Sequence, residues 1–227
     1  MRNLRVVILG ASGAVGSEVV STLQAMPEVS QVTALVRKPF NVRSDAKLQQ
    51  YVVDVINTES YKHLLFNHHA AICTFGVGEP SKVSREEFKA VDFDAVFAFA
   101  RACEELDVAH FELLSAVAAD PTSRSFYLKS KGVLREAIVG LGFQRFSCFQ
   151  PSMLLTQTNR YGLSQAMLLS AWPVLSRALV GGTRKYRGIR VEDLGAAMAQ
   201  NLLTQGQGSE VLHWPEIMRL KYTADSC

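Results

Sequence analysis

The sequence predicts an α/β domain whose core is a doubly wound parallel sheet of about six or seven strands. First, short continuous apolar runs, typical of strands buried on both faces, alternate along the chain with stretches of helical periodicity. Second, a glycine-rich turn follows the first apolar run and opens the first helical stretch. Third, the 227 residues contain no internal repeat or Ser/Gly-rich linker, which suits one domain (1–227). We expect residues 152–190 to form a small C-terminal cover on the substrate side, with no separate second domain.

The first half of the chain supplies four expected strands. Leu4–Leu9 is an apolar run ended by a glycine, and the helical pattern that follows it over Ala14–Met26 is stopped by Pro27. The other elements expected before residue 80 are a weaker helix at Thr58–Phe66 and strands at Val32–Val36, Gln50–Val53 and His69–Thr74.

The second half continues the alternation and then becomes less regular. Ser84 and Glu87 have the spacing of a capping box, which predicts a helix from there through Ala102. A strand at Arg145–Phe149 is stopped by Pro151. The remaining expected elements are a strand at His110–Ser115, a helix at Thr122–Val139, a helical stretch at Tyr161–Leu179 broken at Pro173, a helix at Val191–Leu203 and a last strand at Glu210–Trp214.

The composition is that of an ordinary soluble globular protein, with 48% hydrophobic and 20% charged residues. The formal net charge is only +3 and the basic residues are dispersed, so we expect no nucleic-acid partner. No segment has the roughly 18 uninterrupted apolar residues of a membrane span, and a strand-like run begins directly after Met1-Arg2-Asn3, which leaves no room for a signal peptide. We therefore expect no membrane partner and a cytoplasmic location.

Neither the cysteines nor the histidines have the spacing of metal ligands. His68 and His69 lack a ligand-spaced partner, so we expect no metal site. Four cysteines lie far apart and are interpreted as reduced thiols: Cys73, Cys103, Cys148 and Cys227.

The glycine-rich turn, Gly10-Ala11-Ser12-Gly13-Ala14-Val15-Gly16, predicts a dinucleotide site on a Rossmann fold. Gly10 permits the tight turn, Gly13 lets the backbone approach a pyrophosphate, and Gly16 lets the helix pack close to the strand. The helix N-terminus adds oriented N–H groups, and Ser12 adds a hydroxyl. The alternative is that these are only turn glycines of an α/β protein.

The end of the second strand favours NADP(H) over NAD(H). An NAD enzyme places an acidic residue about 20 positions after the turn, whereas this chain reads Val36-Arg37-Lys38. Two cations there attract a 2′-phosphate that a carboxylate would repel, and Arg37 is the main candidate. The alternative for Arg37 is a solvated surface residue.

Three polar residues form the candidate catalytic group. Tyr127 and Lys131 lie at i and i+4 on one face of an expected helix, and Ser115 ends the preceding strand. A nearby ammonium stabilises a phenolate, so Lys131 would tune Tyr127 as the proton donor or acceptor while Ser115 hydrogen-bonds the substrate oxygen. Without the glycine turn, an exposed pair on a helix face would be the better interpretation.

The Gly-x-x-Gly-x-x-Gly spacing resembles the extended and atypical short-chain dehydrogenases/reductases. The segments Ala90-Val91-Asp92-Phe93-Asp94, Phe111-Glu112-Leu113-Leu114-Ser115, Tyr127-Leu128-Lys129-Ser130-Lys131-Gly132 and Phe149-Gln150-Pro151-Ser152 resemble the Tat-interacting-protein-like branch of atypical members. The resemblance covers roughly the first two thirds of the chain. It implies a small NAD(P)H-binding oxidoreductase and assigns catalysis to Ser115, Tyr127 and Lys131.

The same resemblance extends the cofactor site. It places Asp54 and its neighbour Val55 near the adenine, although Asp54 also suits a cap of the next turn. It implies further cofactor contacts from Thr74, Phe75 and Gly76 after one strand and from Pro151, Ser152 and Met153 after another, and a hold of Lys131 on the nicotinamide ribose.

The chain departs from the family pattern in three ways. Pro151-Ser152 stands where Pro-Gly is common, Phe75 stands in a turn of small residues, and the helix asparagine of the proton relay has no secure match. Two alternatives to an enzyme of this kind therefore stay open. One is a catalytically weak or inactive NADP(H)-binding redox sensor, and the other is a flavin or quinone reductase in which the tyrosine and lysine are irrelevant.

The expected substrate is a small carbonyl or alcohol, because too few residues follow Pro151 for the separate substrate domain of sugar-nucleotide epimerases. Gly181–Arg187 carries several basic residues that could bind an anion, but we interpret it as a solvated face. An apolar stretch at Ala166–Leu179 suggests a possible homodimer. The pocket cover is expected at Gly76–Ser84 and Met153–Leu179, with Phe75, Met153 and Tyr161 as lining candidates.

Overall fold

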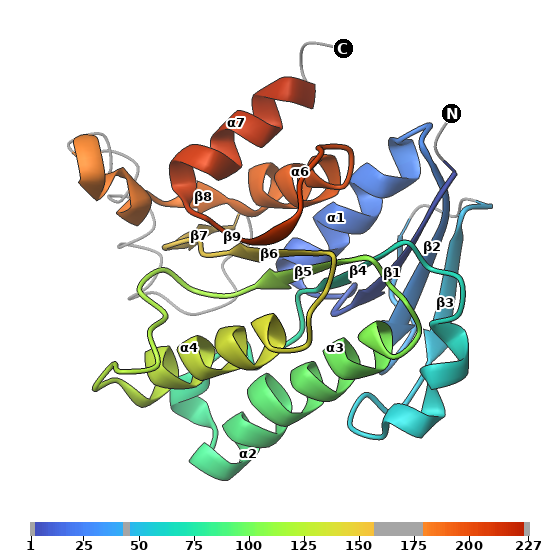
Figure 1. Cartoon of the computed structure of the whole chain (residues 1–227), viewed down its shortest axis with the longest axis horizontal. Helices are drawn as coiled ribbons and strands as arrows, with labels where there is room; N and C mark the ends of the chain where they lie inside the picture. The colour runs from blue at the N-terminus through green and yellow to red at the C-terminus, as the bar shows by residue number, and fades with distance from the viewer. Residues whose placement is uncertain (1–2, 43–45, 157–178, 225–227) are drawn as a thin grey trace.

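The fold is a parallel sheet with helices on both faces (Figure 1). The structure is a computed structural model that describes residues 3–42, 46–156 and 179–224. Seven parallel strands are ordered β3-β2-β1-β4-β5-β6-β9, so the strand order reverses between β1 and β4. The strands are β1 (Leu4–Leu9), β2 (Val29–Val36), β3 (Leu48–Val52), β4 (Ala70–Cys73), β5 (His110–Leu114), β6 (Arg145–Phe149) and β9 (Gly208–Leu212). This confirms the predicted fold class.

Two hydrophobic cores, one on each face of the sheet, hold the helices in place. Along β1, Val6 and Ile8 pack towards one face and Val7 and Leu9 towards the other, and all four are fully buried. Burial on both faces explains why the strands are continuous apolar runs. One face is covered by α1 (Ala14–Ala25), α6 (Val191–Asn201) and α7 (Trp214–Ala224), and the other by α2 (Arg85–Lys89), α3 (Val96–Glu104) and α4 (Phe126–Val139).

Several predicted helices start or continue differently from the sequence-based expectation. The stretch Thr58–Phe66 forms two 3-10 turns, Thr58–Ser60 and Lys62–Leu64, the first capped by the Asn57 side chain. The helix expected from Thr122 begins at Phe126, because the Asp120 carboxylate accepts the Thr122 N–H at 2.7 Å and holds a turn before the helix.

The capping box of the next helix is present, but that helix is not regular throughout. The Ser84 hydroxyl accepts the Glu87 N–H at 3.0 Å, as predicted. The helix then passes through a π-helical segment, η4 (Ala90–Ala95), before α3. Such segments are rare, and they occur frequently at functional sites.

The C-terminal part contains elements that the sequence did not predict. These are α7, a 3-10 segment η5 (Gly181–Tyr186), and a two-stranded parallel pair formed by β7 (Leu154–Leu155) and β8 (Ile189–Arg190). The last strand lies at Gly208–Leu212, and Trp214 begins α7 instead of ending that strand. The helical prediction at Tyr161–Leu179 lies almost wholly outside the described residues, and so does most of the 152–190 cover.

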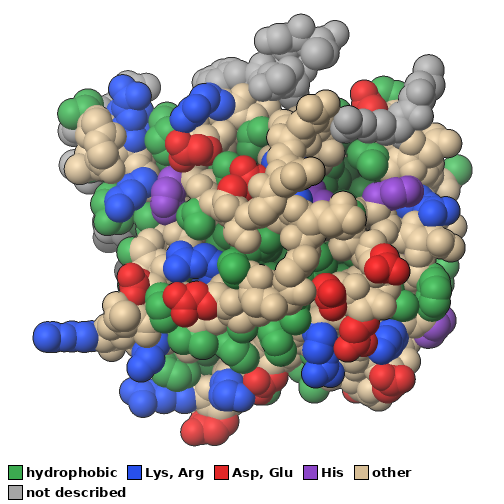
Figure 2. All heavy atoms as spheres, viewed as in Figure 1, with side chains coloured by type: hydrophobic (Ala, Val, Ile, Leu, Met, Phe, Trp, Pro, Cys, Tyr) green, Lys and Arg blue, Asp and Glu red, His purple; other side chains and the backbone are tan. Residues whose placement is uncertain are grey.

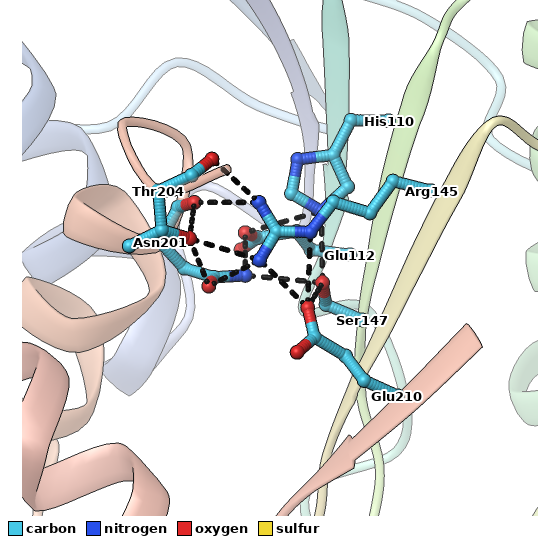
Figure 3. A network of polar contacts seen from close by, with 7 residues as sticks. All are labelled: His110, Glu112, Arg145, Ser147, Asn201, Thr204 and Glu210. Atoms are coloured by element: carbon cyan, nitrogen blue, oxygen red, sulfur yellow. Dashed lines mark hydrogen bonds and ion pairs between the residues drawn. The ribbon is translucent and has the colours of Figure 1, made fainter. Parts of the chain in front are cut away.

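A buried polar network ties β9 and α6 to the middle of the sheet (Figure 3). The Arg145 guanidinium donates to Glu210 Oε1 at 2.7 Å, to the Asn201 side-chain oxygen at 2.8 Å and to the Thr204 carbonyl at 2.9 Å. Asn201 in turn donates to Glu112 Oε1 at 2.9 Å. The network lies at the start of β6, at the amino ends of the strands, whereas the glycine turn lies at their carboxyl ends.

The molecular surface mixes charges of both signs. Figure 2 shows acidic and basic side chains interspersed on the face seen in Figure 1. None of the helices within the described ranges is both long and apolar enough to cross a membrane.

Candidate functional site

The glycine turn forms a tight crossing of two loops. Gly10 has a φ of +95°, and a Cβ there would lie 2.6 Å from the backbone nitrogen of Phe75. A Cβ on Gly16 would collide with the Gly10 carbonyl, so both positions exclude larger residues. The absence of a side chain at Gly16 therefore lets α1 pack closely against the turn, as the sequence predicted.

The N-terminus of α1 is free to hold an anion. Its first residue follows Gly13, which provides no side-chain cap, and its first turn contains no acidic residue. Uncapped N–H groups and the positive end of the helix dipole favour a negatively charged group at this place.

Two adjoining cavities open beside this helix terminus. The larger, of about 330 Å³, is lined by residues from the glycine turn, the loop after β4, the end of β5 and α4. The smaller, of about 180 Å³, lies against the end of β2. Both are lined by Gly13, Thr74, Phe75 and Gly76, so they adjoin at the carboxyl ends of the strands, and we call the pair the trough.

The smaller cavity contains the predicted nucleotide-side residues Gly10, Ser12, Arg37 and Val55. The Arg37 guanidinium lies 6.0 Å from the centroid of the Phe75 ring. Lys38 is exposed and does not line either cavity. The Asp54 carboxylate accepts the Ile56 N–H at 3.1 Å. Asp54 thus caps the next turn, which was the alternative to a contact near the adenine.

The larger cavity brings Ser115, Tyr127 and Lys131 together, with Ala14 and Val15 of the glycine turn. The Ser115 hydroxyl is buried and has no hydrogen-bond partner in the described part of the chain. The Tyr127 ring packs edge-on against Phe88, with the ring centroids 5.8 Å apart. Burial raises the pKa of Tyr127, while Lys131 lowers it to a smaller extent. The phenol is therefore protonated at neutral pH in the cofactor-free protein.

Asp92, which sequence reasoning did not select, also lines this cavity and pairs with Lys131. Its Oδ1 lies 2.9 Å from the Lys131 ammonium, and both residues are buried, with exposed fractions of 4% and 6%. Burial alone would lower the pKa of Lys131, but its neighbours, Asp92 above all and Tyr127 next, outweigh burial and raise that pKa above its ordinary value. An acidic residue inside an apolar helix was the signal available in the sequence.

The cofactor contacts predicted in the segment after β6 line neither cavity: Pro151, Ser152 and Met153. Pro151 is buried and its carbonyl accepts the Val117 N–H at 2.9 Å, while the Met153 carbonyl accepts the Ile189 N–H at 2.9 Å. Ser152 is half-buried between them. Leu154 of β7 is the residue from this segment that reaches the larger cavity.

The other candidates have structural partners. Arg187 of the basic segment lies over the Trp214 ring, 4.9 Å from its centroid, and donates to the Leu179 carbonyl at 2.9 Å. His68 pairs with the Thr33 hydroxyl at 2.9 Å. Of the described cysteines, Cys73, Cys103 and Cys148 are buried free thiols.

Comparison with known proteins identifies relatives along the whole chain. The chain is 28% identical to the protein HTATIP2 of Rattus norvegicus over 228 residues, which is 99% of this chain and 92% of that protein. It is also 31% identical over 160 residues to the mitochondrial protein FMP52 of Lodderomyces elongisporus, covering 67% of each chain. These matches confirm the resemblance to the Tat-interacting-protein-like branch.

Solved structures with the same fold include NAD-binding enzymes. MoeE5 in complex with UDP-glucuronic acid and NAD superposes with a TM-score of 0.72 at 18% identity, covering 98% of this chain and 82% of that one. The oxidoreductase ylbE of Lactococcus lactis gives a TM-score of 0.69 at 16% identity, covering 99% and 98%. The family model described as NAD(P)H-binding matches residues 10–139, which include the glycine turn, Ser115, Tyr127 and Lys131. The chain therefore belongs to this NAD(P)H-binding family.

Proposed function

We propose that the protein is an NADP(H)-dependent oxidoreductase that interconverts a small carbonyl compound and its alcohol. The observation that carries the proposal is the trough, in which one cavity is lined both by the glycine turn and by Ser115, Tyr127 and Lys131 and adjoins a second cavity at the end of β2. A cavity of about 330 Å³ is at the small end of the range for ligand sites, which suits a small substrate.

The residues of the trough fit a dinucleotide. The open N-terminus of α1 suits its pyrophosphate, and the close crossing at Gly10 and Gly13 lets backbone N–H groups approach it. Arg37 lines the smaller cavity, and a guanidinium there would pair with a 2′-phosphate, which supports the proposal of NADP(H) over NAD(H). When bound, the cofactor supplies or accepts the hydride.

The side chains of the larger cavity supply the proton chemistry. Tyr127 donates its phenolic proton to the carbonyl oxygen during reduction and takes it back in the reverse direction. The unpartnered Ser115 hydroxyl hydrogen-bonds the same oxygen and orients it. Lys131 places a positive charge that favours the phenolate left on Tyr127.

The test compares Tyr127→Phe with wild type in a broad carbonyl screen, following the loss of NADPH absorbance. We expect the variant to lose at least about 100-fold in kcat, the lower range for general acid–base catalysis, while its Kd for NADPH changes little. Tyr51→Phe is the matched control, because Tyr51 lies on the edge strand β3 and its hydroxyl donates to Gln49 Oε1 at 3.0 Å, away from both cavities. No turnover of any carbonyl by the wild type, together with tight NADPH binding, would contradict the proposed oxidoreductase activity and favour an NADP(H)-binding sensor.

The cytoplasmic location stays a prediction, because yeast relatives such as FMP52 of Candida albicans are named as mitochondrial proteins. The possible homodimer also stays a prediction, since the apolar stretch at Ala166–Leu179 lies almost wholly outside the described residues.

A further inference from the structure

Asp92 and Lys131 form a buried ion pair at the floor of the larger cavity. Their charged atoms are 2.9 Å apart, and neither side chain is more than 8% exposed. A buried charge is strongly unfavourable unless it is paired and hydrogen-bonded, so each residue accounts for the presence of the other.

The second oxygen of the same carboxylate binds the loop that follows β4. Asp92 Oδ2 accepts the Val77 N–H at 2.7 Å. A Cβ on Gly76 would lie 2.7 Å from Asp92 Oδ1, so the carboxylate packs directly against the loop backbone. One side chain thus joins α4, through Lys131, to the loop that lines both cavities.

The π-helical segment η4 places this carboxylate in the interior. Asp92 and Asp94 belong to the same segment but have opposite environments. Asp94 pairs with Lys89 at 2.8 Å in solvent, where both side chains are more than half exposed. Asp94 is therefore a matched control for any effect of removing an acid from this segment.

Building on the proposed function, we propose that Asp92 is a positioning residue that holds the Lys131 ammonium beside Tyr127 and fixes it to the loop at Val77. An ammonium has three N–H donors, and Asp92 accepts one of them while Lys131 still lines the cavity. Two donors then remain for a bound cofactor or for Tyr127. Asp92 thereby keeps the Lys131 side chain protonated and fixes its orientation.

The electrostatic consequence can be measured without turnover. The groups that act on Lys131 are Asp92 of η4, Tyr127 of α4 and Cys73 of β4. Burial lowers the pKa of this lysine, and Asp92 is the largest of the contributions that raise it. Removing the carboxylate therefore leaves a desolvated amine whose pKa is lower than in the wild type.

The first experiment titrates Lys131 in the cofactor-free protein by NMR of ¹³C-labelled lysine, with the resonance assigned from Lys131→Arg. We expect Asp92→Asn to lower the pKa of Lys131 by at least about one unit, and Asp94→Asn to leave it unchanged. An equal pKa of Lys131 in wild type and Asp92→Asn would overturn the proposal. Because no substrate or cofactor is present, this result is independent of whether the protein turns over a carbonyl.

The second experiment measures kcat against pH in the same variants. A drop of one unit in the pKa of Lys131 reduces its protonated fraction about tenfold at pH values above both pKa values. We therefore expect the alkaline fall in kcat to begin at lower pH in Asp92→Asn and not in Asp94→Asn. A uniform loss of kcat at every pH would indicate a structural role and contradict the proposal.

A third comparison covers the case in which Asp92→Asn folds poorly. The double variant Asp92→Asn/Lys131→Met removes both buried charges. If pairing is what matters, the double variant has a higher midpoint of urea unfolding than Asp92→Asn alone. Equal midpoints for the single and double variants would show that Asp92 acts only through the loop, against the proposal.

Discussion

Folding shifts the pKa values of two neighbouring buried side chains in opposite directions. Glu112 is fully buried, its Oε2 has no partner among the described residues, and burial raises its pKa well above the ordinary value. Its neighbour His110 has a pKa lowered to about 3, by burial first and by Arg145 second. Burial thus favours the neutral form of both residues in the folded protein.

Glu112 gives a pH dependence of stability with a definite sign. A carboxyl whose pKa is raised by folding binds its proton more tightly when folded, so the free energy of unfolding falls as pH rises above about 4.3, the unfolded value. Glu112→Gln removes this fall. We expect the stability of the variant relative to wild type to increase from pH 5 to pH 8, measured by urea unfolding.

The contribution of His110 has the opposite sign, because its lowered pKa makes stability fall as pH drops below about 6.5. The contribution of His110 is present in both wild type and Glu112→Gln, so it largely cancels in the difference between their free energies of unfolding. A difference between Glu112→Gln and wild type that is the same at both pH values would contradict the protonated state of Glu112.

At the residue scale, sequence reasoning succeeds where the backbone position determines the role. Ser115, Tyr127 and Lys131 lie at a strand end and on one helix face, so the alternation of elements was enough to bring them together. The partnership of Asp92 with Lys131 depends on the π-helical segment and on how α4 packs against it. No local pattern reports that packing.

The elements at the edge of the sheet depend on one cation. Arg145, at the start of β6, is 7% exposed and donates to groups on β9, on α6 and in the turn that follows α6 (Figure 3). Its acceptors include the backbone carbonyls of Asn201, the last residue of α6, and of Thr204 in the turn after it. One guanidinium therefore holds the end of a helix and an edge strand to the sheet.

Replacing Arg145 with methionine keeps much of the side-chain volume and removes every one of these bonds. We expect Arg145→Met to lower the free energy of unfolding by about 2–4 kcal/mol, because several partly buried acceptors lose a charge-assisted hydrogen bond. Arg101→Met, which removes an exposed ion pair with Glu105, should cost no more than about 1 kcal/mol. Urea unfolding of the two variants measures the difference, and similar losses would contradict the anchoring role.

At the element scale, boundaries were predictable only where a side chain marks them within a few residues. The cap at Ser84 was predicted correctly because the accepting hydroxyl of Ser84 and the donating N–H of Glu87 are only three residues apart. The final strand was extended to Trp214 because the run is apolar, although Pro215 and Glu216 are start signals for α7. The His213 N–H bonds to Glu216 Oε2 at 3.2 Å, so this cap was also local and the apolar run concealed it.

At the scale of the whole molecule, the order of the strands creates the site. The strand order reverses between β1 and β4, and the glycine turn and the loop that follow these two strands both line the trough. The strand–helix alternation predicts this arrangement, because parallel strands joined by right-handed crossovers allow few other topologies. The described part of the trough extends from Arg37 at one end to Tyr127 at the other.

The central claim is that this trough binds NADP(H), and an equilibrium titration followed by nicotinamide fluorescence tests it most directly. We predict saturable binding of NADPH with a lower Kd than NADH. Arg37→Ala should weaken NADPH by roughly 10- to 100-fold, the loss of about 1.5–3 kcal/mol for a charge-assisted contact, and leave NADH nearly unchanged. The absence of saturable binding, or tighter binding of NADH than NADPH by the wild type, would contradict the account.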